Sequence, residues 1–442
     1  MKKSTLAWTQ YGPLEDEASV QDPLGLDYFA QALGNIILPS FTTRTSRARY
    51  YSMVAYGIKI SEKYVQGKTT ANYSKELLDA FKLYEKYWAR AVVEYYQYNG
   101  GIAERDGKEY DFRGKRGAIR ALKEKKTSLD YAFLTRQLEL GALGAYRTSM
   151  ESLELVKADL RLTHKGYELA NSFLPSGYDK LILESMKSNW ILEKCSGKSL
   201  KSLGRYARLD FDWDESANAD KERELLRSYV IDNSMNNVAI SLIYDEYIQN
   251  GKEYHPIQII ERICNRITGT EKEKQVEQQF RTIKAFEEFS VAIMNVWCEV
   301  VQQVFEHTGR MSIEECTQYV KTYLDIIWDS KLIEKLISTV NYSDIKDSYH
   351  GEAFSRFLQT LLDISKNAYG EFLKELILYH TSVMSKRNSG SWLFMDGGDI
   401  LAVTGLDYAR KTKGAEYLHT YKIGNIIRLI EDSGWNGNGK KN

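Results

Sequence analysis

Basic and hydroxyl side chains gather at residues 38–51, where their chemistry suits the binding of an anion. Arg44, Arg47 and Arg49 stand there among five Ser or Thr residues, directly after Pro39. A guanidinium offers a planar fork of donors for two phosphate oxygens, and the backbone N–H groups that open a helix add more donors. The segment therefore predicts a phosphate site. The alternative is an N-capped helix whose arginines pair with acidic residues of neighbouring elements.

A second set of candidate residues lies between residues 127 and 175. We expect a helix over 129–140, a glycine-containing turn over 141–144, a second helix over 145–156 and a hairpin-like return to a third helix. This order predicts a winged helix-turn-helix. The stretch Leu-x-Leu-Thr-x-x-Gly at 160–166 resembles the strand and wing tip of many bacterial winged-helix domains. In such motifs the second helix can enter a major groove.

The side chains expected to meet DNA in this motif are Arg147 and Ser149 on the second helix and Lys165 at the wing tip. Arginine suits a guanine edge because its two parallel N–H groups match two acceptors. Glu151 and Glu154 on the same helix would repel a phosphate backbone. The alternative is therefore a winged helix that docks on a protein.

Positive charge is concentrated just before this motif. Residues 104–126 hold nine Lys or Arg, among them Lys115 and Arg116, against five Asp or Glu. Over the whole chain Lys plus Arg and Asp plus Glu are both 60, so no global field attracts a polyanion. Any nucleic-acid site must be a local patch, and we expect double-stranded DNA to bind at this one.

Carboxylates suggest two further sites with different chemistry. Asp396 and Asp399 flank two glycines and could hold a metal ion, which leaves a metal-dependent nuclease effector as the alternative function. An Asp-Gly turn is also an ordinary hairpin signal. Residues 210–215 alternate acids, but an EF-hand loop needs glycine at its sixth position and glutamate at its twelfth, where Glu215 and Lys221 stand. A loop that caps the next helix is the better interpretation.

Motifs for cofactor chemistry are absent from the sequence. We find no P-loop, dinucleotide fingerprint, nucleophile elbow or His-Glu-x-x-His, and therefore expect no catalytic residue, metal or cofactor. The four cysteines lie far apart, which argues against disulfides and zinc and favours a reducing cytoplasm. No stretch reaches the ~18 apolar residues of a membrane helix, so no membrane partner is expected.

The elements that must position these residues are mostly helices. Only 5 prolines and as many as 31 tyrosines favour helices that pack through aromatic rings. We predict a mainly α, multi-domain protein with an embedded winged helix-turn-helix and a small C-terminal α+β module. The predicted regions are an N-terminal helical region at 1–100, the winged helix-turn-helix at 101–178, a helical bundle at 179–384 and the α+β module at 385–442.

The residues after Pro39 also carry a resemblance. The pattern is similar to the Pro-(Gly/Ser)-x-(Ser/Thr)-x-x-Thr-x-Arg-x-Arg-Tyr signature of uncharacterised bacterial proteins from anti-phage defence islands, including a Menshen-type component. The matching residues are Pro39, Thr42, Thr45, Arg47, Arg49 and Tyr50. Ser40 stands where relatives often have glycine. The resemblance implies a sensor or assembly subunit that acts with an ATPase and a nuclease as protein partners. Together with the winged-helix residues, it predicts a non-catalytic DNA-binding or assembly subunit, a sensor or adaptor, of a bacterial anti-phage system.

Overall fold

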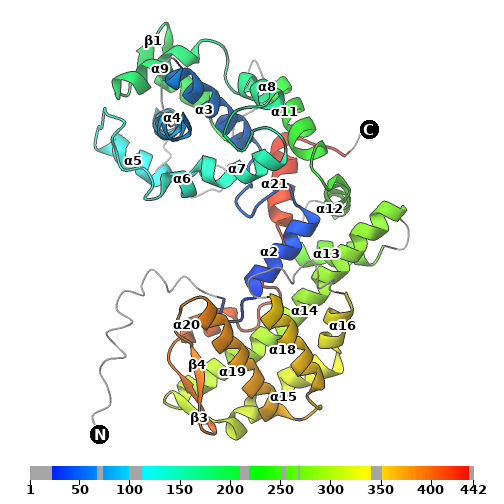
Figure 1. Cartoon of the computed structure of the whole chain (residues 1–442). Helices are drawn as coiled ribbons and strands as arrows, with labels where there is room; N and C mark the ends of the chain where they lie inside the picture. The colour runs from blue at the N-terminus through cyan, green and yellow to red at the C-terminus, as the bar shows by residue number, and fades with distance from the viewer. Residues whose placement is uncertain are drawn as a thin grey trace, which may run out of the picture. The chain divides into compact units, whose positions relative to one another are not determined.

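The computed structural model describes residues 22–66, 73–98, 112–209, 219–250, 255–266, 269–339 and 351–437. The protein is mainly helical, as predicted, and its chain forms two compact units (Figure 1). Unit 1 consists of residues 1–36 and 255–421, and unit 2 of residues 37–254 and 422–442. These boundaries differ from the four predicted regions, because each unit is built from two separate stretches of the chain.

Unit 2 is built around two long helices, α3 (Arg49–Val65) and α4 (Tyr73–Tyr98), which pack against each other (Figure 1). Most residues of α3 are buried, as expected of a helix that is surrounded by others. The remaining elements are α5 (Lys115–Lys123), α6 (Gln137–Leu140), α7 (Ala142–Ser152), α8 (His164–Phe173), α9 (Tyr178–Ser188), β1 (Lys194–Cys195), β2 (Lys198–Ser199), α10 (Leu200–Tyr206), α11 (Ala219–Leu226), the π-helical turn η3 (Arg227–Asp232), α12 (Asn237–Gln249) and α21 (Ile423–Ser433).

Unit 1 is organised around the 36-residue helix α14 (Glu271–Glu306). A capping box starts this helix, because Thr270 and Glu273 each bond the backbone N–H of the other. The other helices are α2 (Leu26–Ile37, whose last residue falls in unit 2), α13 (Pro256–Cys264), α15 (Ile313–Asp329), α16 (Leu332–Thr339), α18 (Gly351–Asp363), α19 (Tyr369–Lys386) and α20 (Leu406–Thr412).

A three-stranded antiparallel sheet with the order β3-β5-β4 completes unit 1. Its strands are β3 (Arg310–Ser312), β4 (Leu393–Asp396) and β5 (Asp399–Ala402). The Asp-Gly hairpin signal is thus confirmed, because β4 and β5 pair across it, and β3 joins them from a distant part of the chain, with Met311 opposite Ile400. No helix in the described parts of the chain has the length and apolar character needed to cross a bilayer.

The first helix of the predicted winged helix-turn-helix differs from the expectation. Of residues 129–140, only the four residues of α6 are helical. Burial alternates along the preceding stretch, because Leu129, Tyr131 and Phe133 point inward while Asp130 and Ala132 are exposed. That alternation is typical of an extended chain. The second helix forms as α7, and Val156 and Leu162 pair as the expected hairpin-like return.

Candidate nucleic-acid interface

The short helix α5 displays the basic segment that the sequence singled out. Its start is fixed by Phe112, which packs edge-on against Trp88, and by Gly114, which adopts a left-handed φ of 82°. Gly117, Ala118 and Ala121 form the buried side of the helix. These small side chains let α5 lie close to the backbone of Phe133.

The opposite side of α5 carries three exposed cations, Arg116, Arg120 and Lys123, which we call the α5 basic face. Their spacing of four and three residues places them on one side of the helix, about 6 Å and 4.5 Å apart along its axis. None of the three forms an ion pair or hydrogen bond through its side chain with any residue that the structure describes. They are therefore available to an anionic partner.

More cations lie at both ends of this face. Arg113, next to Gly114, donates to the carbonyl oxygens of Leu140 (3.1 Å) and Arg44 (3.5 Å), which holds the Arg44 backbone close to the start of α5. The Arg44 side chain is exposed and donates to the carbonyl of Glu139 at 3.2 Å. At the other end, Lys125 and Lys126 are exposed. Of the predicted nucleic-acid contacts, the structure thus brings together Arg44, Lys115 and Arg116.

Between residues 112 and 126, the described part of the basic segment, only Glu124 is acidic. Glu124 pairs with Lys126 at 3.8 Å, so it leaves the α5 basic face without a carboxylate partner. The helix also has no acidic residue in its first turn, where a carboxylate would favour the positive end of the helix dipole. The charges around α5 therefore attract an anion, although they do not stabilise the helix itself.

The predicted contacts on α7 and α8 are differently placed. Ser149 is buried, and its hydroxyl bonds Tyr51 (2.6 Å) and the carbonyl of Ser40, so it cannot meet a base edge. Arg147 is partly exposed, but its guanidinium donates to Glu151 at 2.7 Å and to the Ala158 carbonyl at 2.8 Å. Lys165 lies in the first turn of α8 rather than at a wing tip, because Thr163 caps that helix.

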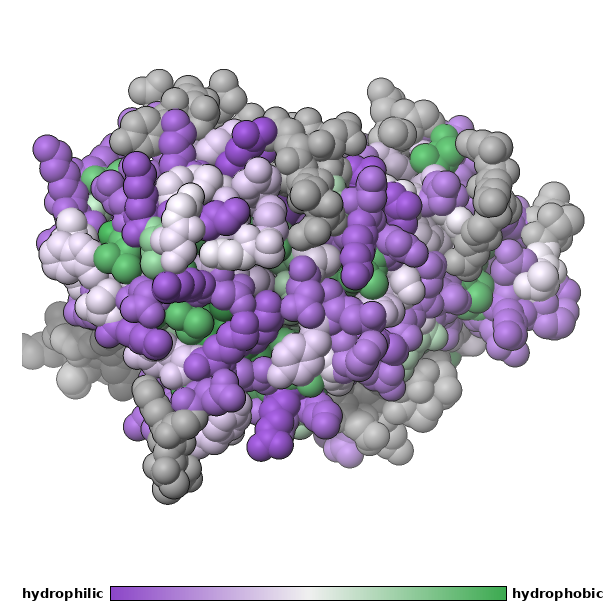
Figure 2. Space-filling view, turned by 90° about the horizontal axis from the view of Figure 1, so that it is seen from above, coloured by the Kyte–Doolittle hydropathy of each residue, from purple (hydrophilic) through white to green (hydrophobic). Residues whose placement is uncertain are grey.

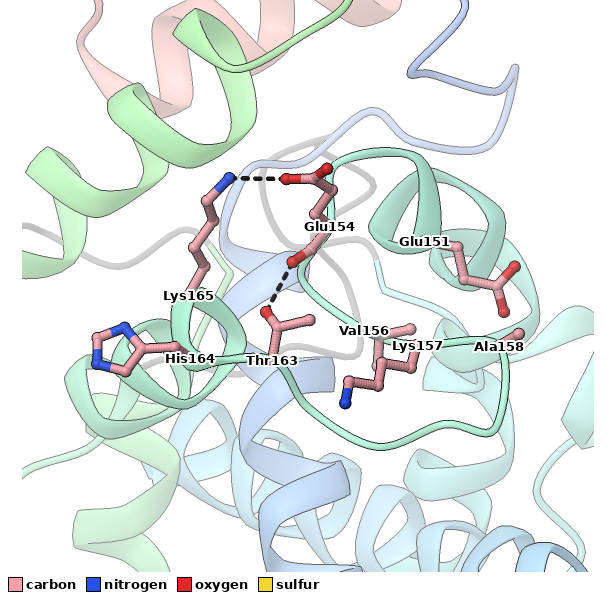
Figure 3. A pocket seen from close by; sticks show the side chains of 8 residues that line it. All are labelled: Glu151, Glu154, Val156, Lys157, Ala158, Thr163, His164 and Lys165. Atoms are coloured by element: carbon pink, nitrogen blue, oxygen red, sulfur yellow. Dashed lines mark hydrogen bonds and ion pairs between the residues drawn. The ribbon is translucent and has the colours of Figure 1, made fainter.

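An open pocket of about 710 Å³ lies between the hairpin and the start of α8 (Figure 3). Lys165 reaches across it to Glu154 at 3.0 Å, and Thr163 donates to the Glu154 carbonyl at 2.6 Å. Glu151 adds a second carboxylate to the lining, beside the cations of Lys157 and Lys165. The charges in the pocket largely offset one another, so it is a poor site for a phosphate.

No known protein family matches this chain, and no curated protein or solved structure matches it either.

The signature arginines are buried inside unit 2, which corrects the expectation that they contact phosphate. The Arg49 guanidinium lies against both carboxylate oxygens of Glu222 at 3.0–3.1 Å and also donates to the carbonyls of Arg208 and Phe173. Arg47 donates to Asp432 at 2.8 Å and to the Leu209 carbonyl at 2.6 Å. The alternative interpretation, arginines paired with acids of neighbouring elements, is the one that the structure has.

Three residues hold this region together through contacts that the sequence does not indicate. Lys422 is buried and donates to the carbonyls of Leu38 and Phe41, and burial lowers its pKa to about 8. Tyr146 accepts from the backbone N–H groups of Ser46 and Arg47. Glu85 on α4 accepts from the Ala142 N–H at 2.6 Å and so fixes the start of α7. None carries a local sequence signal, because each acts over a long separation in the chain.

The carboxylates Asp396 and Asp399, which the alternative nuclease hypothesis assigned to a metal ion, are bridged by an arginine. Arg310 on β3 donates to Asp396 at 3.0 Å and to Asp399 at 2.6 Å, across the neighbouring strands. A guanidinium in this place gives both carboxylates a charged partner without a metal ion and offsets one of their two negative charges. Within the described ranges no group of three or more His, Cys, Asp or Glu could hold a metal, and residues 210–215 lie outside those ranges.

Proposed function

We propose that the protein binds double-stranded DNA through the α5 basic face, as a non-catalytic sensor or adaptor subunit of a bacterial antiviral system. The observation that carries the proposal is the set of three exposed cations on one side of an anchored helix, which form no ion pair with any residue in the described ranges. Charges on one DNA strand follow one another every ~3.4 Å along the duplex axis, so side chains ~6 and ~4.5 Å apart can each meet a separate phosphate.

The winged-helix form of the proposal places DNA at α7 instead. It is supported by the order of α6, α7, a hairpin-like return and α8. Against it stand the burial of Ser149 and the pairing of Arg147 and Lys165 with glutamates. We therefore favour α5 as the contact surface and treat α7 as the competing site.

A salt titration of duplex binding tests the proposal. The variant Arg116→Gln/Arg120→Gln/Lys123→Gln should bind a blunt 20-base-pair duplex more weakly, and the slope of log K against log salt should fall by about 2.7, at about 0.9 for each lost phosphate contact. The matched control is Arg356→Gln/Arg410→Gln/Lys374→Gln, which removes the same charge from exposed positions of unit 1. Its slope should equal that of the unchanged protein.

Two outcomes contradict this assignment. If the α5 variant keeps the full slope, the α5 basic face does not contact DNA. If Arg147→Gln/Lys165→Gln lowers the slope while the α5 variant does not, the interface lies at α7 and α8.

The antiviral context and the ATPase and nuclease partners follow from the resemblance of residues 39–50 to defence-island proteins. Co-expression with the products of neighbouring genes tests this part of the proposal. We expect the protein to co-elute with an ATPase or a nuclease on gel filtration. If the protein elutes separately from every co-expressed product, this part of the proposal is wrong.

A further inference from the structure

Trp190 is the most exposed large aromatic side chain among the described residues, with 48% of its surface accessible. A tryptophan in a folded protein is ordinarily well covered, because its ring is a large apolar surface. It follows directly after α9, whose last turn is closed by Asn189 in a left-handed conformation (φ 51°). Its exposure therefore calls for a partner that covers the ring.

The backbone around Trp190 is held in place by the segment that follows α5. Leu129 N donates to the Asn189 carbonyl at 3.2 Å, Ile191 N donates to the Thr127 carbonyl at 2.6 Å, and Ser128 lies opposite Trp190 in an antiparallel bridge. Side chains alternate in such a pair, so Leu129 and Ile191 are buried while Ser128 and Trp190 face outward. The indole is thus presented from a fixed backbone.

This pairing also brings the indole close to the cations at the end of α5. Lys126 is only two residues before Ser128, which is about 7 Å of extended chain, and opposed Cα atoms in an antiparallel pair are about 5 Å apart. Lys125 precedes Lys126 in the chain, and both lysines are exposed. An exposed aromatic ring therefore lies close to the cations that follow α5.

We propose that Trp190 stacks on an unpaired base of a nucleic acid whose backbone is held by the α5 basic face, so that the preferred ligand is a duplex with a single-stranded extension. The proposal rests on the proposed function, since α5 supplies the backbone contacts. A basic surface with an adjacent aromatic ring is the combination that binds single strands, because every base offers a π face to stack on. Bases inside an intact duplex are already stacked and cannot cover the indole.

A protein partner could also cover an exposed tryptophan, but the surroundings favour a nucleic acid. The neighbours of Trp190 on the paired segment are the polar residues Thr127 and Ser128, the exposed cations Lys125 and Lys126, and one carboxylate, Asp130, which accepts from the Asn189 side chain at 2.5 Å. Aromatic anchors of protein interfaces lie instead in an apolar centre depleted of charge. Stacking with nearby cations fits these neighbours better.

The test compares three ligands at fixed salt: a blunt duplex, the same duplex with a six-nucleotide 3′ or 5′ extension, and the extension alone. We expect the full chain to bind one of the extended duplexes more tightly than the blunt one. Trp190→Ala should remove this preference, a loss of roughly 5- to 150-fold, and leave blunt-duplex affinity unchanged. Trp190→Phe should keep part of the preference, because a phenyl ring still stacks.

Tryptophan emission gives an independent measure of stacking. The extended duplex should quench the emission of the unchanged protein more than that of Trp190→Phe. Tyr319→Ala serves as the matched control, because it removes a 41% exposed aromatic ring from unit 1 and should change neither readout.

The outcomes separate the two proposals. Equal affinity for blunt and extended duplexes, or a preference that survives in Trp190→Ala, overturns the stacking site while duplex binding through α5 stands. Absence of binding to all three ligands overturns both. Equal binding of polyglutamate, with the same dependence on α5, would show that the surface takes any polyanion and would also overturn the assignment to nucleic acid.

Discussion

At the scale of single residues, the arginines of the signature illustrate how one pattern supports two functions. Arg47 and Arg49 have the charge and spacing of phosphate ligands, but both guanidinium groups are enclosed by acceptors of unit 2. The sequence shows that arginine forks are present. It does not show whether their partners are phosphates or carboxylates, because Glu222 and Asp432 lie more than 170 and 380 positions away.

Replacement of Arg49 tests its structural role. Arg49→Met leaves the Glu222 carboxylate buried without a partner, and we expect a loss of about 3–5 kcal/mol in the free energy of unfolding. Arg49→Lys should recover only a small part, because an ammonium cannot reach Glu222 and the two carbonyls as the planar fork does. Denaturant unfolding measures both. If Arg49→Met is as stable as Arg44→Met, which alters an exposed arginine, the ion pair is not a structural contact.

A buried histidine of unit 1 predicts a dependence of stability on pH. Burial by itself would lower the pKa of His419, but its hydrogen bonds to Asp27 and Glu287 outweigh that effect and raise the pKa to about 9. The stabilisation is therefore full below pH 6.5, the ordinary value, and is lost as pH rises through 9.

We expect unit 1 to lose on the order of 3 kcal/mol between pH 6.5 and 9.5, and His419→Gln to remove most of this dependence. Unfolding curves at several pH values measure it, with the exposed His307→Gln as the control. An equally steep decline in His419→Gln would assign the effect to another group.

At the scale of elements, much of the structure could be predicted from the sequence. The long helices, the two C-terminal strands and the basic segment follow from periodicity, turn residues and charge. Residues 129–133 are extended rather than helical. Burial alternates there, but the sequence does not show it, because the exposed Ala132 is apolar and the leucines further along match a helical spacing. The third strand, β3, could not be predicted from the sequence. It is only three residues long, which is too short for a recognisable pattern, and its pairing with β5 is non-local.

Because α5 packs closely on the backbone of Ala132 and Phe133, replacement of Gly117 by alanine should destabilise the protein. Glycine in the middle of a helix normally costs about 1 kcal/mol relative to alanine. At Gly117, however, a Cβ atom would lie 2.8 Å from the Ala132 carbonyl oxygen and closer still to that of Phe133. Gly117→Ala should therefore destabilise unit 2 by about 1–3 kcal/mol, as overpacking does. Thermal unfolding checks this, and a stabilised variant would contradict the observed packing.

A matched substitution separates this local effect from a general effect of alanine. Gly398 lies in the turn between β4 and β5 with open space around it and an ordinary φ. Gly398→Ala should change the melting temperature little.

At the scale of the whole molecule, the chain contributes alternately to the two units. Residues 385–442 are predicted as one module, but α21 completes unit 2. Its buried residues include Ile426, Ile427 and Ile430, and Asp432 accepts from Arg47. The chain passes from unit 1 to unit 2 between Tyr421 and Lys422, and the amino-acid composition does not change at this point. The boundary could therefore not be predicted from the sequence.

Removal of residues 422–442 should therefore affect unit 2 selectively. We expect faster amide hydrogen exchange in α3 and α12, because the truncated chain lacks Asp432, the partner of Arg47, and the apolar side of α21. The protection of α19 and β5 should stay unchanged. Uniform loss of protection across both units would contradict this division of the chain, and unchanged protection in α3 would show that α21 is dispensable.

The placement of α2 has a consequence for biogenesis. Phe29 on this helix stacks on Phe354 at 4.3 Å and also contacts Phe286. A ribosome that adds about 5–20 residues per second needs on the order of tens of seconds between these phenylalanines. During that interval the nascent helix is without its aromatic neighbours, whereas most of unit 2 has already emerged. Chaperone demand during translation should accordingly fall on α2.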